Sequence, residues 1–210
     1  PSPTAGGQDV ERWTAIERPP ATNEADAALL GRPLALCLRG EALYVADGQD
    51  CAVKVFSRDG RFLRAIGRKG RGPGELDLPS GVAAGEGGIY VADKLNRRVQ
   101  VFDLEGRVIG GFPVPFAPDK ILVLGGGRLL VTGNPSGRVA GEPMLRIYGP
   151  DGRLLWEGLE AFSSSDRTYD AFRNMILVCP GDKGGFDVVY RSGDRDIRRF
   201  DGAGALRARV

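Results

Sequence analysis

The fold is decided by the stretch PSGVAAGEGGIYVADKLNRRVQVFDLEGRVIGGF, residues Pro79–Phe112. It contains short apolar runs that begin at Gly81, at Gly88, at Val99 and after Gly106, with turn residues between them. The run IYVA is apolar on both faces, which is typical of a strand that is covered on both sides. The stretch therefore predicts four short strands, joined by tight turns, in a sheet that lies between two other layers.

The same unit recurs along the chain. The third strand of each unit carries an aromatic anchor: Phe56, Phe102, Tyr148 and Phe200. These anchors are 46, 46 and 52 residues apart, and turn glycines keep the same spacing: Gly60, Gly106, Gly152 and Gly204. Four-stranded units that repeat every 40–50 residues or so indicate propeller blades. The sequence therefore predicts an all-β fold, a β-propeller or propeller arc of about four four-stranded antiparallel blades, in preference to a β-sandwich.

Composition excludes several classes of function. The chain has 210 residues and no histidine, which excludes Ser-His-Asp triads, zincin motifs and His-ligated haem. The net charge of +2 is mixed in sign and gives no strong case for binding nucleic acid. No apolar run reaches the 18 or so residues of a membrane span, so no membrane insertion is predicted. The three cysteines form no CxxC motif, which leaves a Cys37–Cys51 bridge as an open alternative to small buried thiols.

The segment GRKGRGPGEL, Gly67–Leu76, resembles a phosphate-binding loop at first sight. A P-loop needs a lysine directly after its last glycine, followed by serine or threonine, whereas here Lys69 precedes Gly70. A dinucleotide fingerprint needs a following helix, and the proline-containing sequence after Gly74 predicts none. We therefore interpret the segment as a connection between two blades, in which glycine allows positive φ and proline adds stiffness. No cofactor is expected.

The aligned units resemble the NHL-repeat family of β-propellers, and the bacterial six-bladed type most of all. In the second unit the family pattern falls on Pro79, Gly81–Ala83, Gly88–Asp93, Asn96, Arg98–Asp103 and Gly106. The first unit keeps Tyr44–Asp47, and the last two keep only the aromatic and turn anchors, with Gly133 and Arg191 near the aspartate position. The glycine-rich segment also matches the family, in which it joins consecutive blades. The resemblance covers residues 34–210.

The resemblance implies a division of the chain into an extension and four blades. The extension, residues 1–33, contains a possible closing strand at Glu11–Glu17, which would pair with the last blade. The blades are expected at residues 34–78, 79–115, 116–162 and 163–210. Six blades of this size need about 270 residues. The sequence is therefore compatible with a fragment of a longer protein, with a four-bladed ring, or with an open arc that another chain completes.

Three functions follow as expectations. The first is a non-catalytic binding or scaffolding module for a protein partner, or for self-association through open blade edges, located outside the cytoplasm in the envelope or extracellular space. The second is a Ca²⁺-dependent, lactonase-like hydrolase whose channel carboxylates would be Asp47 and Asp93. The third is an RNA- or polyanion-binding domain. The candidate binding-surface residues are Arg68, Lys69, Arg71, Asn96, Arg97 and Arg98, of which Asn96 and Arg98 are also expected to brace the turn after the second strand.

Overall fold

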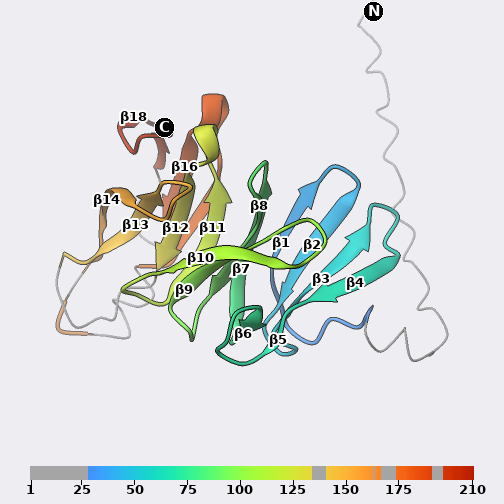
Figure 1. The fold of residues 1–210 in the computed structure, drawn as a ribbon. Coiled ribbons are helices and arrows are strands. Elements are labelled where there is room, and N and C mark those ends of the chain that lie inside the picture. Colours follow the sequence, from blue (N-terminus) through green and yellow to red (C-terminus); the bar gives the residue numbers. More distant parts are fainter. Residues whose placement is uncertain (1–27, 134–140, 163, 167–173, 191–195) are drawn as a thin grey trace, which may run out of the picture.

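The computed structural model describes residues 28–133, 141–162, 164–166, 174–190 and 196–210. In these residues the chain forms four four-stranded antiparallel sheets arranged as propeller blades (Figure 1). The prediction of an all-β, four-bladed propeller is therefore confirmed. The predicted strand at Glu11–Glu17 lies outside the described residues. Within the described ranges, no helix combines the length and the hydrophobicity needed to cross a membrane.

Each blade is a meander in which strands adjacent in the sheet follow one another in the chain. Blade 1 contains β1 (Pro33–Arg39), β2 (Ala42–Asp47), β3 (Ala52–Ser57) and β4 (Phe62–Ile66). Blade 2 contains β7 (Pro79–Gly85), β8 (Gly88–Asp93), β9 (Arg98–Phe102) and β10 (Val108–Pro113). Blade 3 contains β11 (Pro118–Val123), β12 (Leu129–Gly133), β13 (Pro143–Tyr148) and β14 (Leu154–Glu160). Blade 4 contains β15 (Ile176–Pro180), β16 (Phe186–Tyr190), β17 (Ile197–Phe200) and β18 (Leu206–Arg209).

Four short elements lie in the connections. β5 (Arg68–Lys69) and β6 (Glu75–Leu76) pair in parallel between blades 1 and 2. Single 3-10 turns, η1 (Gly125–Gly127) and η2 (Asp182–Gly184), join the first two strands of blades 3 and 4.

The hairpin between the third and fourth strands is the same in every blade. Its glycine has a positive φ of 80–91° in all four copies: Gly60, Gly106, Gly152 and Gly204. That conformation costs an L side chain free energy, which explains why glycine recurs at this spacing. At Gly204 a Cβ atom would also lie 2.3 Å from the Trp156 ring, so close packing requires glycine there as well.

Three apolar cores lie between consecutive blades, and one cross-strand pair in each blade shows how they form. The pair joins an apolar residue of the second strand to the aromatic anchor of the third: Leu43–Phe56, Ile89–Phe102, Leu129–Tyr148 and Phe186–Phe200. In blades 2 to 4 both members are buried in the core shared with the preceding blade. In blade 1 both members are only half-buried. We call the side of a blade that carries this pair its leading face, and the opposite side its trailing face.

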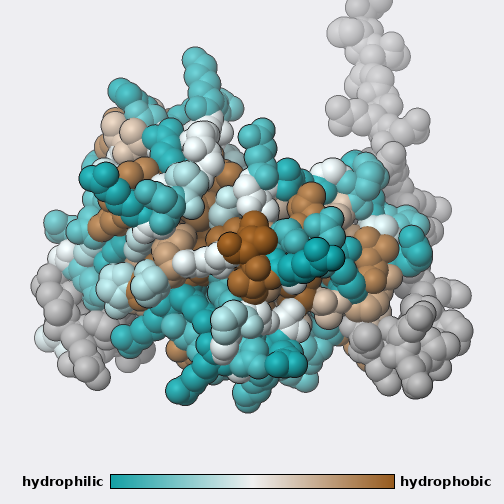
Figure 2. Space-filling view, in the orientation of Figure 1, coloured by the Kyte–Doolittle hydropathy of each residue, from teal (hydrophilic) through white to brown (hydrophobic). Residues whose placement is uncertain are grey.

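Among the described residues, no blade packs against the leading face of blade 1, which carries exposed and half-buried apolar side chains. In the described residues, the apolar cores join blades 1 and 2, 2 and 3, and 3 and 4, but not 4 and 1. Leu36 and Leu38 of β1 point to this side, and Leu36 is 71% exposed. Figure 2 shows hydrophobic residues near β3 and β4 of blade 1, and a second group over β10, where Ile109 is 58% exposed.

The trailing face of blade 4 departs from the repeat. The equivalent cross-strand pair is apolar in the other three blades: Tyr44–Val55, Tyr90–Val101 and Leu130–Ile147. Blade 4 has Asp187 and Arg199 there, in a two-pronged ion pair with both N–O distances at 3.0 Å. The hydrogen bonds from Arg199 hold the pKa of the Asp187 carboxyl below its ordinary value. This face therefore mixes charge with exposed apolar residues such as Leu177 and Ile197.

Candidate functional site

The glycine-rich connection between blades 1 and 2 surrounds an anion that belongs to the chain itself. The carboxylate of Glu75 accepts hydrogen bonds from the backbone N–H groups of Arg71 and Gly72, at 3.1 and 3.0 Å. Its other oxygen accepts from the Arg68 guanidinium at 3.0 and 3.2 Å. The Gly72 bond is the largest of the effects that lower the pKa of Glu75 below its ordinary value, followed by the bond from Arg68. The backbone donors that suggested a phosphate site are thus occupied by this side chain.

Arg98 holds the same connection against blade 2. Its guanidinium donates to the backbone carbonyl oxygens of Arg71, Gly72 and Glu75 at 2.7–2.9 Å. It also donates to the buried carboxylate of Asp93 at 2.8 Å. The structure therefore gives Arg98 a bracing position.

The other predicted binding-surface residues divide into two groups. Asn96 donates to the carbonyl oxygen of Gly70 and to Asp93, at 2.9 and 2.8 Å, so it too lies under the connection. The side chains of Lys69, Arg71 and Arg97 are exposed. Only this second group, with Arg68 beside it, still presents charge to the solvent.

Asp47 and Asp93 each attach the incoming chain to their own blade. Asp47 accepts backbone hydrogen bonds from Gly31 and Arg32 at 2.7 and 2.9 Å, and from two residues of the following turn. Asp93 accepts from the backbone N–H of Asp77 at 2.7 Å and from the side chains of Asn96 and Arg98. Both carboxylates are fully buried and have their oxygens in use. In the described ranges, no group of three or more acidic, Cys or His side chains could hold a metal ion.

Blade 3 makes the same attachment without a carboxylate. Gly133 stands at the aspartate position, and a Cβ atom there would lie 2.0 Å from the ring of Phe116 in the incoming connection. The guanidinium of Arg146 lies 4.1 Å from the centre of that ring. An aromatic ring and a cation–π contact thus replace the hydrogen-bonded carboxylate. The corresponding residue of blade 4, Arg191, lies outside the described residues.

A buried polar series on the third strand completes these attachments, and the repeat analysis missed it. Lys54, Gln100 and Arg146 are each less than 7% exposed and are 46 residues apart. Lys54 contacts the backbone of Leu29, Gln100 that of Gly74 and Glu75, and Arg146 the ring of Phe116. The 46-residue spacing was the available signal, because it matches that of the aromatic anchors.

Acid should destabilise the fold through Asp47. Burial raises the pKa of this carboxyl, but backbone hydrogen bonds led by that from Arg32 outweigh it, so the pKa lies below its ordinary value. Its contribution to stability is therefore complete above about pH 4 and is lost as the pH falls through the lowered pKa. We expect Asp47→Asn to be less stable at neutral pH but to lose less stability on acidification, as measured by urea denaturation from about pH 5 to pH 2. An equal loss in both proteins would assign the acid sensitivity to other carboxylates.

The architecture agrees with that of a known protein family. A family model described as 6-bladed beta-propeller matches residues 22–130, just over half of the chain. The chain belongs to the 6-bladed beta-propeller family. The match covers blades 1 and 2 and the start of blade 3, where the family pattern of the sequence is most complete.

One protein is similar to this chain in sequence, and two solved structures are similar to it in fold. RING finger protein nhl-1 of Caenorhabditis elegans is 34% identical over 93 residues, which are 42% of this chain and 10% of that protein. A Bacteroides fragilis protein, provisionally named as exported, superposes with a TM-score of 0.68 at 18% identity, over 88% of this chain and 51% of its own. A virginiamycin B lyase from Staphylococcus aureus gives a TM-score of 0.58 at 14% identity, over 83% and 54%. At these identities the superpositions show the fold alone.

This member of the 6-bladed beta-propeller family matches only part of the length of the proteins that it resembles. The chain spans about half the length of the two solved structures and a tenth of the curated relative.

Proposed function

We propose that this member of the 6-bladed beta-propeller family is a non-catalytic binding module that engages a protein partner through the leading face of blade 1. The observation that carries the proposal is the half-buried pair Leu43–Phe56. The equivalent pair is buried in each of the other three blades by a packed sheet. Blade 1 therefore has a face constructed for contact with another apolar sheet, and such exposed faces mark interaction sites.

The chemistry of the predicted channel residues supports a binding role over the two alternatives. A Ca²⁺ site needs six or more oxygen ligands, whereas Asp47 and Asp93 already accept hydrogen bonds from their own blades. A polyanion site needs an extended set of accessible cations. Arg98 is committed to backbone carbonyl oxygens, and Arg68 pairs with Glu75, which leaves Lys69, Arg71 and Arg97 as a small exposed group. The module is proposed to act in the periplasm or outside the cell, with support from its resemblance to bacterial envelope propellers.

Sedimentation velocity tests the proposed face. We expect the wild-type chain to associate at micromolar concentration and to bind the dye ANS, because Leu36 and its neighbours are apolar and exposed. Leu36→Asp should shift the chain towards monomer and reduce the dye signal. Leu155→Asp, at a similarly exposed leucine on β14 of blade 3, should leave both unchanged and serves as the matched control.

Two results would count against the proposal. A wild-type chain that is monomeric and binds no ANS has no accessible apolar face on blade 1. Equal effects of Leu36→Asp and Leu155→Asp would mean that added charge, rather than loss of the leading face, causes the change.

A further inference from the structure

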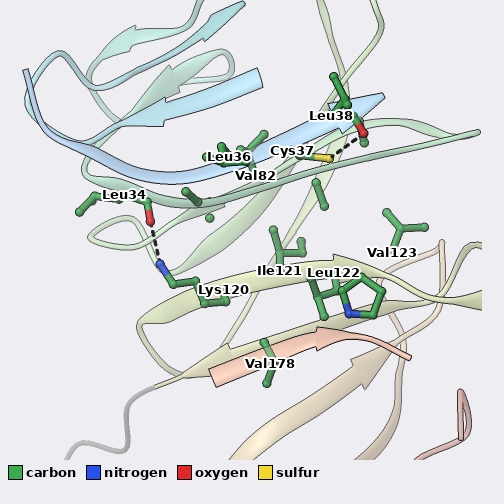
Figure 3. Close-up of a pocket in the computed structure, with 15 residues that line it drawn as sticks. Leu34, Leu36, Cys37, Leu38, Val82, Lys120, Ile121, Leu122, Val123 and Val178 are labelled. Atoms are coloured by element: carbon green, nitrogen blue, oxygen red, sulfur yellow. Dashed lines mark hydrogen bonds between the residues drawn. The ribbon is translucent and has the colours of Figure 1, made fainter. Parts of the chain in front are cut away.

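An apolar groove runs along the inner strands of the blades. Its volume is about 490 Å³, within the range of small-molecule sites, and β1, β7, β11 and β15 all contribute to its walls. Fifteen residues line it, and Lys120 is the one charged residue among them (Figure 3). The side chains of Leu36, Val82, Leu122 and Val178 lie around the opening between the strands.

Charge is confined to one end of this groove. Lys120 lies beside Leu34 at that end, and Leu38 and Val123 lie at the opposite end (Figure 3). From Leu34 to Leu38 the extended strand β1 measures about 13 Å. The groove is therefore elongated, and its two ends differ. An ammonium group lies at one end, and aliphatic side chains line the rest.

The Lys120 ammonium bonds to backbone oxygens and not to a carboxylate. Its Nζ donates to the carbonyl oxygen of Leu34 at 2.8 Å and, more weakly, to that of Ser80 at 3.5 Å. An ammonium group has three donors, so one remains after these two bonds. Among the residues that the structure describes, no carboxylate pairs with it, because the adjacent Asp119 binds Lys94 at 3.0 Å.

We propose that this groove binds an amphiphile with a carboxylate head and an unbranched aliphatic tail. The carboxylate accepts a charge-assisted hydrogen bond from Lys120, and the tail lies along β1 and β11 over Leu36 and Leu122. A phosphate-rich ligand such as a nucleotide does not suit the groove, because it would meet one cation and apolar walls. This proposal does not require a protein partner on the leading face of blade 1, although Leu36 and Leu38 belong to both surfaces.

Calorimetric titration with decanoate, below its micelle-forming concentration, tests the proposal. We expect the wild-type chain to bind decanoate, and Lys120→Gln to bind it about 10- to 100-fold more weakly, since that variant keeps a donor but loses the charge. Decanol should bind both proteins equally. Octanoate should bind the wild type roughly tenfold more weakly than decanoate, because two buried methylenes are lost. Lys69→Gln is the matched control, because Lys69 is exposed in the connection between blades 1 and 2, does not line the groove and should leave decanoate affinity unchanged.

The results that would contradict the decanoate proposal can be told apart from one another. Absence of decanoate binding to the wild type, or equal binding to Lys120→Gln, overturns the proposal. If Lys120→Gln lowers the melting temperature, Lys120→Arg decides: retained decanoate binding supports the charge, and its loss contradicts it. Leu36 belongs both to the groove and to the leading face of blade 1, so a leading-face residue outside the groove separates the two proposals. Phe56→Ala should weaken association and leave decanoate binding unchanged, because Phe56 does not line the groove.

Discussion

Replacement of Arg98 by methionine is expected to lower the free energy of unfolding by about 3–5 kcal/mol. The guanidinium is the partner of Asp93, whose carboxylate is fully buried, so its removal leaves an uncompensated charge. It also removes one hydrogen-bond donor from each of three carbonyl oxygens of the glycine-rich connection, of which those of Gly72 and Glu75 keep a second donor. Urea denaturation at pH 7 measures the effect.

Arg68→Met is the matched control for this experiment. Arg68 also pairs with a carboxylate, that of Glu75, but its side chain is 81% exposed, so the loss should stay below about 1 kcal/mol. Similar losses in the two variants would mean that Arg98 acts as an ordinary surface cation. In that case the hydrogen bonds of Arg98 to the connection would add little to the free energy of unfolding.

Truncation of the aromatic anchors should have very different effects in different blades. Phe102→Ala should cost about 3–5 kcal/mol, because this ring is 1% exposed in the core between blades 1 and 2. Phe56→Ala, at the same position of the repeat, should cost about 1–2 kcal/mol, because the ring is half-buried on the open leading face of blade 1.

The difference between the two variants is the informative quantity. Thermal and urea denaturation of both proteins at low concentration, where association is weakest, provides it. If Phe56→Ala proves as costly as Phe102→Ala, then the leading face of blade 1 is already covered in solution, and it is not available to a partner.

The sequence predicted the blades because their determinants are local and periodic. Gly106 and its equivalents need a positive φ, and Phe102 and its equivalents need a neighbouring sheet, so both leave a 46-residue signal. The expectation that Asn96 and Arg98 brace a turn rested instead on the resemblance of the second unit to the NHL-repeat pattern.

Other features depend on contacts that no spacing reveals. Glu75 appeared as part of a family motif, but only the closed loop brings its carboxylate to the N–H groups of Arg71 and Gly72. In blade 3 the ring of Phe116 fills the space over Gly133 and takes the place of the aspartate that the first two blades carry. An aromatic ring and a carboxylate have no chemical property in common, so the repeat does not reveal this replacement. Lys120 reaches Leu34 across 86 residues, so the polarised groove could not be predicted from the chain alone.

The distribution of the three apolar cores sets the order in which the molecule opens. Blades 2 and 3 each share two cores with their neighbours, whereas blades 1 and 4 each share one in the described residues. In a linear array of this kind, stability is the sum of terms within repeats and between nearest neighbours. Fraying therefore begins at the two terminal blades and moves inward, and the central pair forms the last cooperative unit to melt.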